Sequence, residues 1–272
     1  LINLDGKTMR ATIPEGKTKG VHLLAAYVPE EGRVLCQVEV GSHENEIPAA
    51  KRMVKQLDLR GKVVTGDALL AQRGLSTAIV ERKGDYVWTV KGNQEGLKRD
   101  IETLFEAEPC SGGFSLCHKD FQTVVRRGKG HGRLERQTLT GSSMLTDYLR
   151  WPYCEQVFRL ERHFERISDG KILEEVSYGV TSLTREEADA ERLLAIVRGH
   201  WSIENQLHFR RDDTLREDRC RLKGQGGQAM AAVNNLVLGL LRNTGFETLP
   251  DARRYYAANL PAAVALVLRS PA

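Results

Sequence analysis

The chain has 272 residues, a length typical of one large domain or of one domain with a sizeable insertion. Hydrophobic residues make up 41% and charged residues 28% of it, which indicates a soluble globular protein and excludes a disordered one. No apolar run is long enough to span a bilayer and no secretory signal opens the sequence, so we expect neither a membrane protein nor a secreted one.

The cysteines are odd in number and widely scattered, and no two of them form a C-x-x-C pair. They are Cys36, Cys110, Cys117, Cys154 and Cys220. This pattern favours a reduced, cytoplasmic chain without a structural zinc site.

The first part of the chain predicts three strands followed by alternating helices and strands. The strands are expected at 1–5 (with Gly6 turning the chain), 22–28, 34–40, 62–66 and 86–90, and the helices at 46–59 and from Asp67 to Lys83. Hairpin order implies antiparallel pairing, whereas alternation with helices implies parallel pairing. We therefore expect a mixed five-stranded sheet flanked by helices on both faces.

The second part begins with a helix at about 94–107 and continues into a region rich in β-formers and turn residues, 109–178. A helical pattern resumes at about Arg185 and continues to Asp218. A linker at 222–227 precedes an apolar helix at 229–242, and an amphipathic segment at 252–268 closes the chain.

The stretch from Arg198 to Asp218 is the most informative part of the sequence. It reads as a helix with one broad apolar face, made by Leu193, Ile196, Val197, Trp201, Ile203 and Leu207. His200, Glu204 and His208 follow at intervals of four residues, within or beside that face. A carboxylate there is costly unless a cation or a hydrogen-bond donor meets it. Glu204 is therefore either held by an Arg or a flanking His, or it is a metal ligand.

Two aspartates near strand ends complete the set of candidate acids. Asp5 precedes Gly6, as a turn-opening Asp would, and Asp67 follows a strand and precedes a helix, as a helix N-cap would. In the predicted sheet both lie near one edge. If the helix that carries Glu204 crosses beside them, three carboxylates converge, and divalent cations such as Mg²⁺ or Mn²⁺ are needed to neutralise them.

Basic residues cluster in two stretches of the chain. One holds Arg126, Arg127, Lys129, Arg133 and Arg136, and the other holds Arg210, Arg211, Arg216, Arg219, Arg221 and Lys223. Such runs are often solvated faces, but two of them beside candidate acids suggest a polyanionic substrate.

Five motifs in order resemble bacterial insertion-sequence DDE transposases, in the branch of the H-repeat-associated proteins. They are DGKT at Asp5, TGDALLAQ around Asp67, DYVWTVKGNQ from Asp85, GHGRLERQ from Gly130 and HWSIENQLHFRRDDTLRED from His200. Together they cover essentially the whole chain.

The resemblance implies a ribonuclease H-like core, at 1–108 and 179–272, with a β-rich insertion at 109–178. It implies that Asp5, Asp67 and Glu204 bind two Mg²⁺ ions, with Mn²⁺ able to substitute, and that Asp5 bridges both ions. The implied reaction is DNA cleavage at transposon ends followed by strand transfer into target DNA. The implied partners are double-stranded DNA (terminal inverted repeats and target) and a second copy of the chain in the synapsed state, in the bacterial cytoplasm with the nucleoid.

Further candidates are residues that would contact DNA or orient water. They are Lys91, Asn93, His131, Arg133, Arg136, His200, Asn205 and Arg211. In related transposases a Tyr and an Arg precede the Glu and a Lys follows it. Val197, His200 and Arg211 occupy those spacings here, so the signature is altered. Trp88 and Trp201 are expected in the core rather than stacked on bases.

Two alternatives remain at this stage. The chain begins at the first acid strand, so it is either an active enzyme or a truncated remnant that binds DNA without cutting it. The other alternative is a zinc hydrolase that uses His200, Glu204 and His208, but three ligands at successive four-residue spacings on one straight helix span too far to share an ion.

Overall fold

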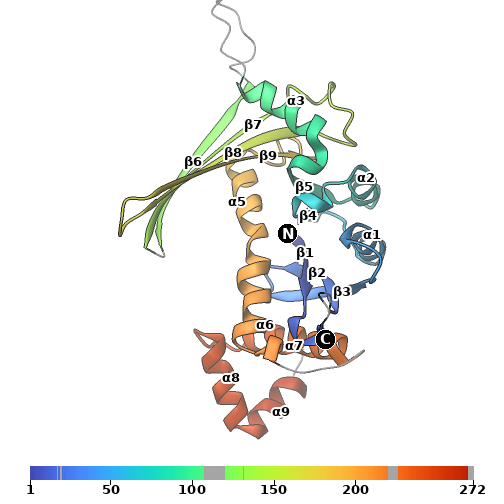
Figure 1. The fold of residues 1–272 in the computed structure, drawn as a ribbon, viewed down its shortest axis with the longest axis vertical. Coiled ribbons are helices and arrows are strands. Elements are labelled where there is room, and N and C mark those ends of the chain that lie inside the picture. Colours follow the sequence, from blue (N-terminus) through green and yellow to red (C-terminus); the bar gives the residue numbers. More distant parts are fainter. Residues whose placement is uncertain (17, 19, 107–119, 131, 220–225, 269–272) are drawn as a thin grey trace, which may run out of the picture. The chain divides into compact units, whose positions relative to one another are not determined.

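Two units make up the chain: Leu1–Leu57 with Trp201–Ala272, and Asp58–His200 (Figure 1). The computed structural model describes residues 1–16, 18, 20–106, 120–130, 132–219 and 226–268. The predicted 222–227 linker lies largely outside these residues, as do Cys110, Cys117 and Cys220. Cys36 and Cys154 are free thiols. None of the described helices is both long and apolar enough to cross a membrane.

The first unit contains an antiparallel sheet in the order β3-β2-β1. Its strands are β1 (Ile2–Thr8), β2 (His22–Val28) and β3 (Arg33–Val40), which confirms the three predicted strands. Gly6 does not turn the chain, because β1 continues through it and Gly6 pairs with Leu24. A side chain at Gly6 would overlap Glu46 and His22, so glycine allows these two side chains to approach the strand.

The helices of the first unit come from both of its chain segments. They are α1 (Glu46–Gln56), a π-helical stretch (Ile203–His208), α6 (Phe209–Asp213), α7 (Gly226–Arg242), α8 (Leu249–Ala258) and α9 (Leu260–Leu268). The closing segment is thus two helices rather than one. The helix expected from 185 to 218 is not regular either, because the π-helical stretch interrupts it.

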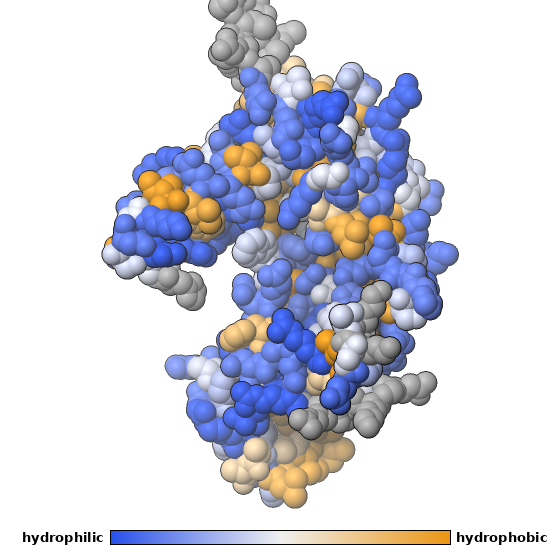
Figure 2. Space-filling view, viewed as in Figure 1, coloured by the Kyte–Doolittle hydropathy of each residue, from blue (hydrophilic) through white to orange (hydrophobic). Residues whose placement is uncertain are grey.

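The core of the first unit forms where the π-helical stretch meets the sheet. Ile203 and Leu207 pack on Ala25 and Tyr27 of β2, together with Leu238 of α7. At the other end of the unit, α9 has no buried residue and exposes large apolar side chains. Figure 2 shows these side chains gathered over α8 and α9.

A buried ion pair links α6 to the segment that follows it. Arg211 and Glu217 are both fully buried, and the Arg211 Nη2 lies 2.6 Å from Glu217 Oε1. Asn234 of α7 donates to the other carboxylate oxygen at 2.7 Å. Gln37 of β3 accepts from Asn235 at 2.9 Å, so α7 turns amides, rather than its most apolar side, toward this network.

The second unit contains a six-stranded mixed sheet in the order β4-β5-β9-β8-β7-β6. Its strands are β4 (Val63–Gly66), β5 (Asp85–Val90), β6 (Gln122–Gly130), β7 (Arg133–Ser142), β8 (Gln156–Arg166) and β9 (Ile172–Thr181). Among the strand pairs that the structure describes within this unit, β4–β5 is parallel and the others are antiparallel. The prediction that five strands make up the sheet is wrong, because β5 pairs with β9 and the sheet continues into the region that was expected to be an insertion.

The described helices that pack on this sheet are α2 (Arg73–Glu81), α3 (Glu95–Glu106) and α5 (Ala190–His200). α5 packs against β4, β6 and β7, whereas α2 contacts β5 and α3 contacts β8 and β9. Trp88 of β5 is completely buried, as predicted, and its indole N–H donates to Ser76 of α2 at 3.0 Å. The second unit is therefore a mixed α/β structure with its core under β5.

We expect Gly179→Ala to destabilise the second unit by about 1–3 kcal/mol, because overpacking a filled core forces neighbours to move. A Cβ at this position of β9 would overlap the Phe158 ring and the Trp88 carbonyl oxygen. Gly141→Ala is the matched control in β7, where the nearest atom is 3.7 Å away. Urea unfolding of both variants measures the difference. Equal midpoints would contradict the packing described here.

We expect Arg211→Ala to lower the free energy of unfolding by about 3–5 kcal/mol, because it leaves the Glu217 carboxylate buried without its cation. Arg219→Ala, at an exposed position of the same region, is the control. Thermal and urea unfolding measure both. A loss below about 1 kcal/mol, the size expected of a surface ion pair, would show that the pair is not buried as described.

Candidate functional site

One face of β1 is polar and packs against the helical segment of the same unit. Asn3 donates to the Ser202 hydroxyl at 3.0 Å. Two strand positions after Asp5, Lys7 Nζ lies 2.6 Å from Asp212 Oδ2. Because alternate residues of a strand share a face, Asp5 lies between these two contacts, on the side that meets the helix. It stands within the strand rather than at its end, so the expected turn-opening role is wrong.

The middle contact of this face joins Asp5 to His208. The His208 Nε2 lies 3.2 Å from Asp5 Oδ2. Within the described residues, both ring nitrogens of His208 are buried and neither makes a hydrogen bond. Leaving a buried polar group unsatisfied costs about 1–3 kcal/mol, so the lack of hydrogen bonds to this imidazole lowers the stability of the fold.

Glu204 lies on the π-helical stretch that carries His208. Its neighbours Ile203 and Leu207 are buried, but Glu204 itself is exposed, as is Asn205. Glu204 is therefore not on the apolar face, and the desolvation cost expected from a regular helical wheel does not arise. Trp201 is 47% exposed, so its predicted place in the core is wrong.

Asp67 lies in the second unit, directly after β4. Its carboxylate accepts from the Leu70 backbone N–H at 3.3 Å, which confirms the predicted capping role, here for the short 3₁₀ turn Ala68–Leu70. Asn93, which follows β5, donates to the Ala68 carbonyl at 2.6 Å. Because β4 and β5 are parallel neighbours, Asp67, Lys91 and Asn93 lie at the same edge of the sheet, as expected.

The three candidate acids are thus divided between the units, with Asp5 and Glu204 in the first and Asp67 in the second. Their convergence stays a prediction. Across the described ranges, no group of three or more His, Cys, Asp or Glu side chains is arranged to hold a metal ion. The donors themselves suit one, since carboxylate oxygens are what hard divalent cations prefer and the unsatisfied imidazole beside Asp5 adds a nitrogen donor.

His200 ends α5 in the second unit. Its Nδ1 lies 3.0 Å from the Thr65 hydroxyl on β4, two residues before Asp67. The ring thus ties α5 to the strand that leads to this acid. The role expected for His200, orienting water or DNA, remains a prediction. The contact gives no support to the zinc site considered for His200, Glu204 and His208.

Arg211 was expected to contact DNA, and its position contradicts that expectation. The side chain has no exposed surface and is bound to Glu217. The expectation failed because the π-helical stretch rotates every residue after it relative to a regular helix. Arg211 is a structural residue of the first unit.

The basic cluster between Arg126 and Arg136 forms the β6–β7 hairpin of the second unit. Its cationic side chains are exposed: Arg126, Arg127, Lys129, Arg133 and Arg136. Together with Arg198 of α5, four of them line a small groove of about 190 Å³. His131, expected here as a backbone contact, lies outside the described residues.

Like charges face each other once across this hairpin and once across the next strand pair, β7 and β8. Arg127 of β6 pairs directly with Arg136 of β7, and Arg133 pairs with Arg166 of β8. Directly opposed like charges destabilise a sheet, so these positions are unfavourable for the isolated fold. A polyanion bound to the hairpin would remove that cost.

The base of the hairpin is fixed by a half-buried carboxylate, that of Asp120. Asp120 accepts hydrogen bonds from the hydroxyls of Ser142 and Ser143 and pairs with Arg185 at 2.8 Å. Burial raises the pKa of the Asp120 carboxyl, but these hydrogen bonds and the Arg185 charge outweigh it and hold the pKa below its usual value. The hairpin is therefore anchored at its base and exposed along its length.

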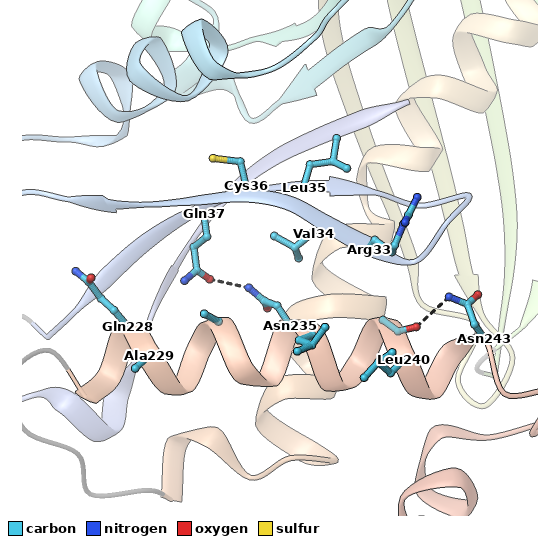
Figure 3. Close-up of a pocket in the computed structure, with 13 residues that line it drawn as sticks. Arg33, Val34, Leu35, Cys36, Gln37, Gln228, Ala229, Asn235, Leu240 and Asn243 are labelled. Atoms are coloured by element: carbon cyan, nitrogen blue, oxygen red, sulfur yellow. Dashed lines mark hydrogen bonds between the residues drawn. The ribbon is translucent and has the colours of Figure 1, made fainter. Parts of the chain in front are cut away.

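A large groove lies elsewhere in the first unit, between β3 and α7 (Figure 3). It measures about 870 Å³ and is lined by apolar and amide side chains such as Val34, Leu236, Gln37 and Asn235. None of the candidate acids lines it. From the sequence, His208 was considered only for the zinc alternative, Arg126 and Arg127 were named only as part of a basic run, and Arg198 was given no role. For His208 the signal was its spacing from Glu204, and for the arginines it was the basic run.

The chain is similar in sequence to a known protein family and to several bacterial proteins. The "Transposase DDE domain" family matches residues 1–238. The "Putative transposase YncI" of Escherichia coli O157:H7 is 30% identical over 89% of this chain and 62% of its own length. The "H repeat-associated putative transposase YhhI" of E. coli K12 is 26% identical over 89% of this chain and 64% of its own. The chain thus spans less than two thirds of the length of these relatives.

Among solved structures, the chain is similar to piggyBac transposase in a synaptic complex with hairpin DNA. The TM-score is 0.45 and the identity 11%, over 99% of this chain and 54% of that one. The resemblance read from the sequence is confirmed by the family match and by the named relatives. The chain belongs to the transposase DDE domain family and is related to the H repeat-associated transposases.

Proposed function

We propose that this chain catalyses metal-dependent cleavage of DNA at transposon ends and transfer of the freed strand into target DNA. Its membership of the transposase DDE domain family supports the proposal. We propose a ribonuclease H-like core at 1–108 and 179–272, with the strands of 109–178 as an insertion that contacts DNA.

Asp5, Asp67 and Glu204 are the proposed metal-binding acids. Their carboxylates supply the oxygen ligands that Mg²⁺ prefers, with Mn²⁺ as a substitute. Metal ions held by these acids would supply activation of an attacking oxygen and stabilisation of a departing one on a phosphodiester. The protein's part is to hold the acids at fixed positions: Asp67 at the end of β4 and Asp5 in the middle of β1.

The observation that carries the proposal is the packing of β1 on the helical segment that bears Glu204. The contacts Asn3–Ser202 and Lys7–Asp212 fix that packing on either side of Asp5. Two acids that are 199 positions apart in the sequence (204 − 5) therefore belong to two packed elements of one unit. Apolar packing of β1 on this helical segment would not by itself need a carboxylate at Asp5, so the presence of the acid supports a role in binding a cation.

DNA is the proposed partner, as terminal inverted repeats and as target, bound by a homodimer in the synapsed state. The opposed arginines of the β6–β7 hairpin support a polyanion at that surface. Lys91, Arg133 and Arg136 are exposed and are proposed to contact phosphates, which position DNA without reading its sequence. Asn205, exposed beside Glu204, and His131 remain proposed contacts. Asn93, which donates to the carbonyl of the Asp67 turn, is exposed and is also proposed to contact DNA.

We expect Asp67→Asn and Glu204→Gln each to lower DNA nicking by about a hundredfold or more, because each removes a charged ligand where the reaction needs it. The assay uses a labelled transposon-end duplex with Mg²⁺ or Mn²⁺. Asp58→Asn and Glu247→Gln, at exposed positions of the second and first units, are the matched controls.

Nicking at the wild-type rate by both variants would refute the assignment of these acids to the metal site. Protein that binds the duplex but never nicks it with either ion would instead identify the chain as a DNA-binding remnant.

We expect Arg127→Ala and Arg136→Ala each to reduce the slope of log K against log salt by about one, since each removes one phosphate contact. Neither should lower the stability of the fold, because removing one of two opposed charges relieves repulsion. Lys51→Ala, exposed on α1, is the control. Binding titrations at several salt concentrations, with urea unfolding alongside, test both parts. An unchanged slope with lowered stability would assign these arginines to the fold instead.

A further inference from the structure

The Asp5–His208 contact differs from the two contacts that flank it. Asn3 donates to Ser202 and Lys7 donates to Asp212 Oδ2, both with hydrogen-bond geometry, although Asp212 Oδ1 has no partner of its own among the described residues. The imidazole and the Asp5 carboxylate lie 3.2 Å apart, yet their geometry is not that of a hydrogen bond. The neighbouring contacts thus hold His208 Nε2 and Asp5 Oδ2, two atoms that can bind a metal ion, close together without a hydrogen bond between them.

A second histidine of the same unit shows how a structural imidazole is satisfied. His22 has one ring nitrogen 2.7 Å from the Thr8 hydroxyl and the other 2.7 Å from Glu46 Oε1. In the described part of the chain, His208 has no hydrogen bond at either nitrogen, although only 12% of its side chain is exposed. A buried imidazole in this state is suited to a ligand that the protein itself does not supply.

The separation of the two donor atoms fits a shared cation. Two ligands at about 2.1 Å from one ion and at right angles to each other are about 3 Å apart. The 3.2 Å between His208 Nε2 and Asp5 Oδ2 is close to that value. Glu204, on the same π-helical stretch, is exposed and adds an oxygen donor to the same segment.

We propose that His208 is a nitrogen ligand, beside Asp5, of one divalent cation. This inference rests on the proposed function, because it concerns one of the ions held by the three acids. Imidazole favours transition metals over Mg²⁺, whereas carboxylates accept both. The position beside Asp5 therefore selects Mn²⁺ over Mg²⁺ more strongly than three carboxylates alone would.

The test is pulsed EPR of Mn²⁺ added to the DNA-free protein, which detects a directly bound nitrogen by its hyperfine coupling. Wild-type protein is expected to show a ¹⁴N coupling, and protein labelled with [¹⁵N]histidine is expected to replace it with a ¹⁵N coupling. The labelled protein needs no substitution, so this part of the test does not depend on a variant that folds.

Substitution then locates the ligand. His208→Asn and His208→Gln are expected to lose the nitrogen coupling and to weaken Mn²⁺ binding about tenfold or more, while Mg²⁺ binding changes less. His43→Asn, at an exposed position of the same unit, is the matched control and is expected to keep the coupling. Circular dichroism of each variant verifies that the fold is intact.

Two results would overturn the inference: no nitrogen coupling in wild-type protein that binds Mn²⁺, or an unchanged coupling in both His208 variants. In either case, nicking that still depends on Asp67 would leave the proposed function standing. Protein that neither binds Mn²⁺ nor nicks DNA would overturn the proposed function itself, and the inference with it.

Discussion

The packing of one polar strand face on one interrupted helix is the constraint on which the first unit depends. Asn3, Asp5 and Lys7 are placed by strand alternation, and Ser202, His208 and Asp212 by the helical segment. Beneath these polar contacts, Ile203 and Leu207 bury their side chains on β2. The apolar contacts supply the stability, while the polar ones fix which carboxylate faces which side chain. Any drift of the helix along the strand would break both sets together.

In the second unit, the main feature is a row of exposed cationic side chains on strands of a larger sheet. A hairpin with opposed arginines is poor in isolation, but it continues a six-stranded sheet and is anchored by Asp120 at its base. The resulting surface is unfavourable for the free protein and favourable for a polyanion, and that asymmetry is what electrostatic recognition requires.

Local patterns in the sequence were enough to place most elements and one of the acids, Asp67. Apolar runs bounded by turn residues located β2, β3 and β5, and the strand-to-helix transition identified Asp67 as a cap. The pairing of β5 with β9 could not be derived, because periodicity identifies a strand but not its partner. The burial of Arg211 could not be derived either, because Arg211 follows a π-helical stretch that spacing rules do not predict. Trp201 precedes that stretch, and its exposure depends on packing that periodicity does not specify.

That stretch has a consequence for how the chain tolerates changes in length. A π turn contains more residues than an α turn, so a one-residue deletion between Ile203 and His208 can be absorbed by a return to α-helical pairing. The same deletion within α7 cannot be absorbed in this way, because α7 is a regular α-helix, and it would rotate Asn234 away from Glu217. Length variation among relatives of this chain should therefore be accommodated close to Glu204 more readily than along α7.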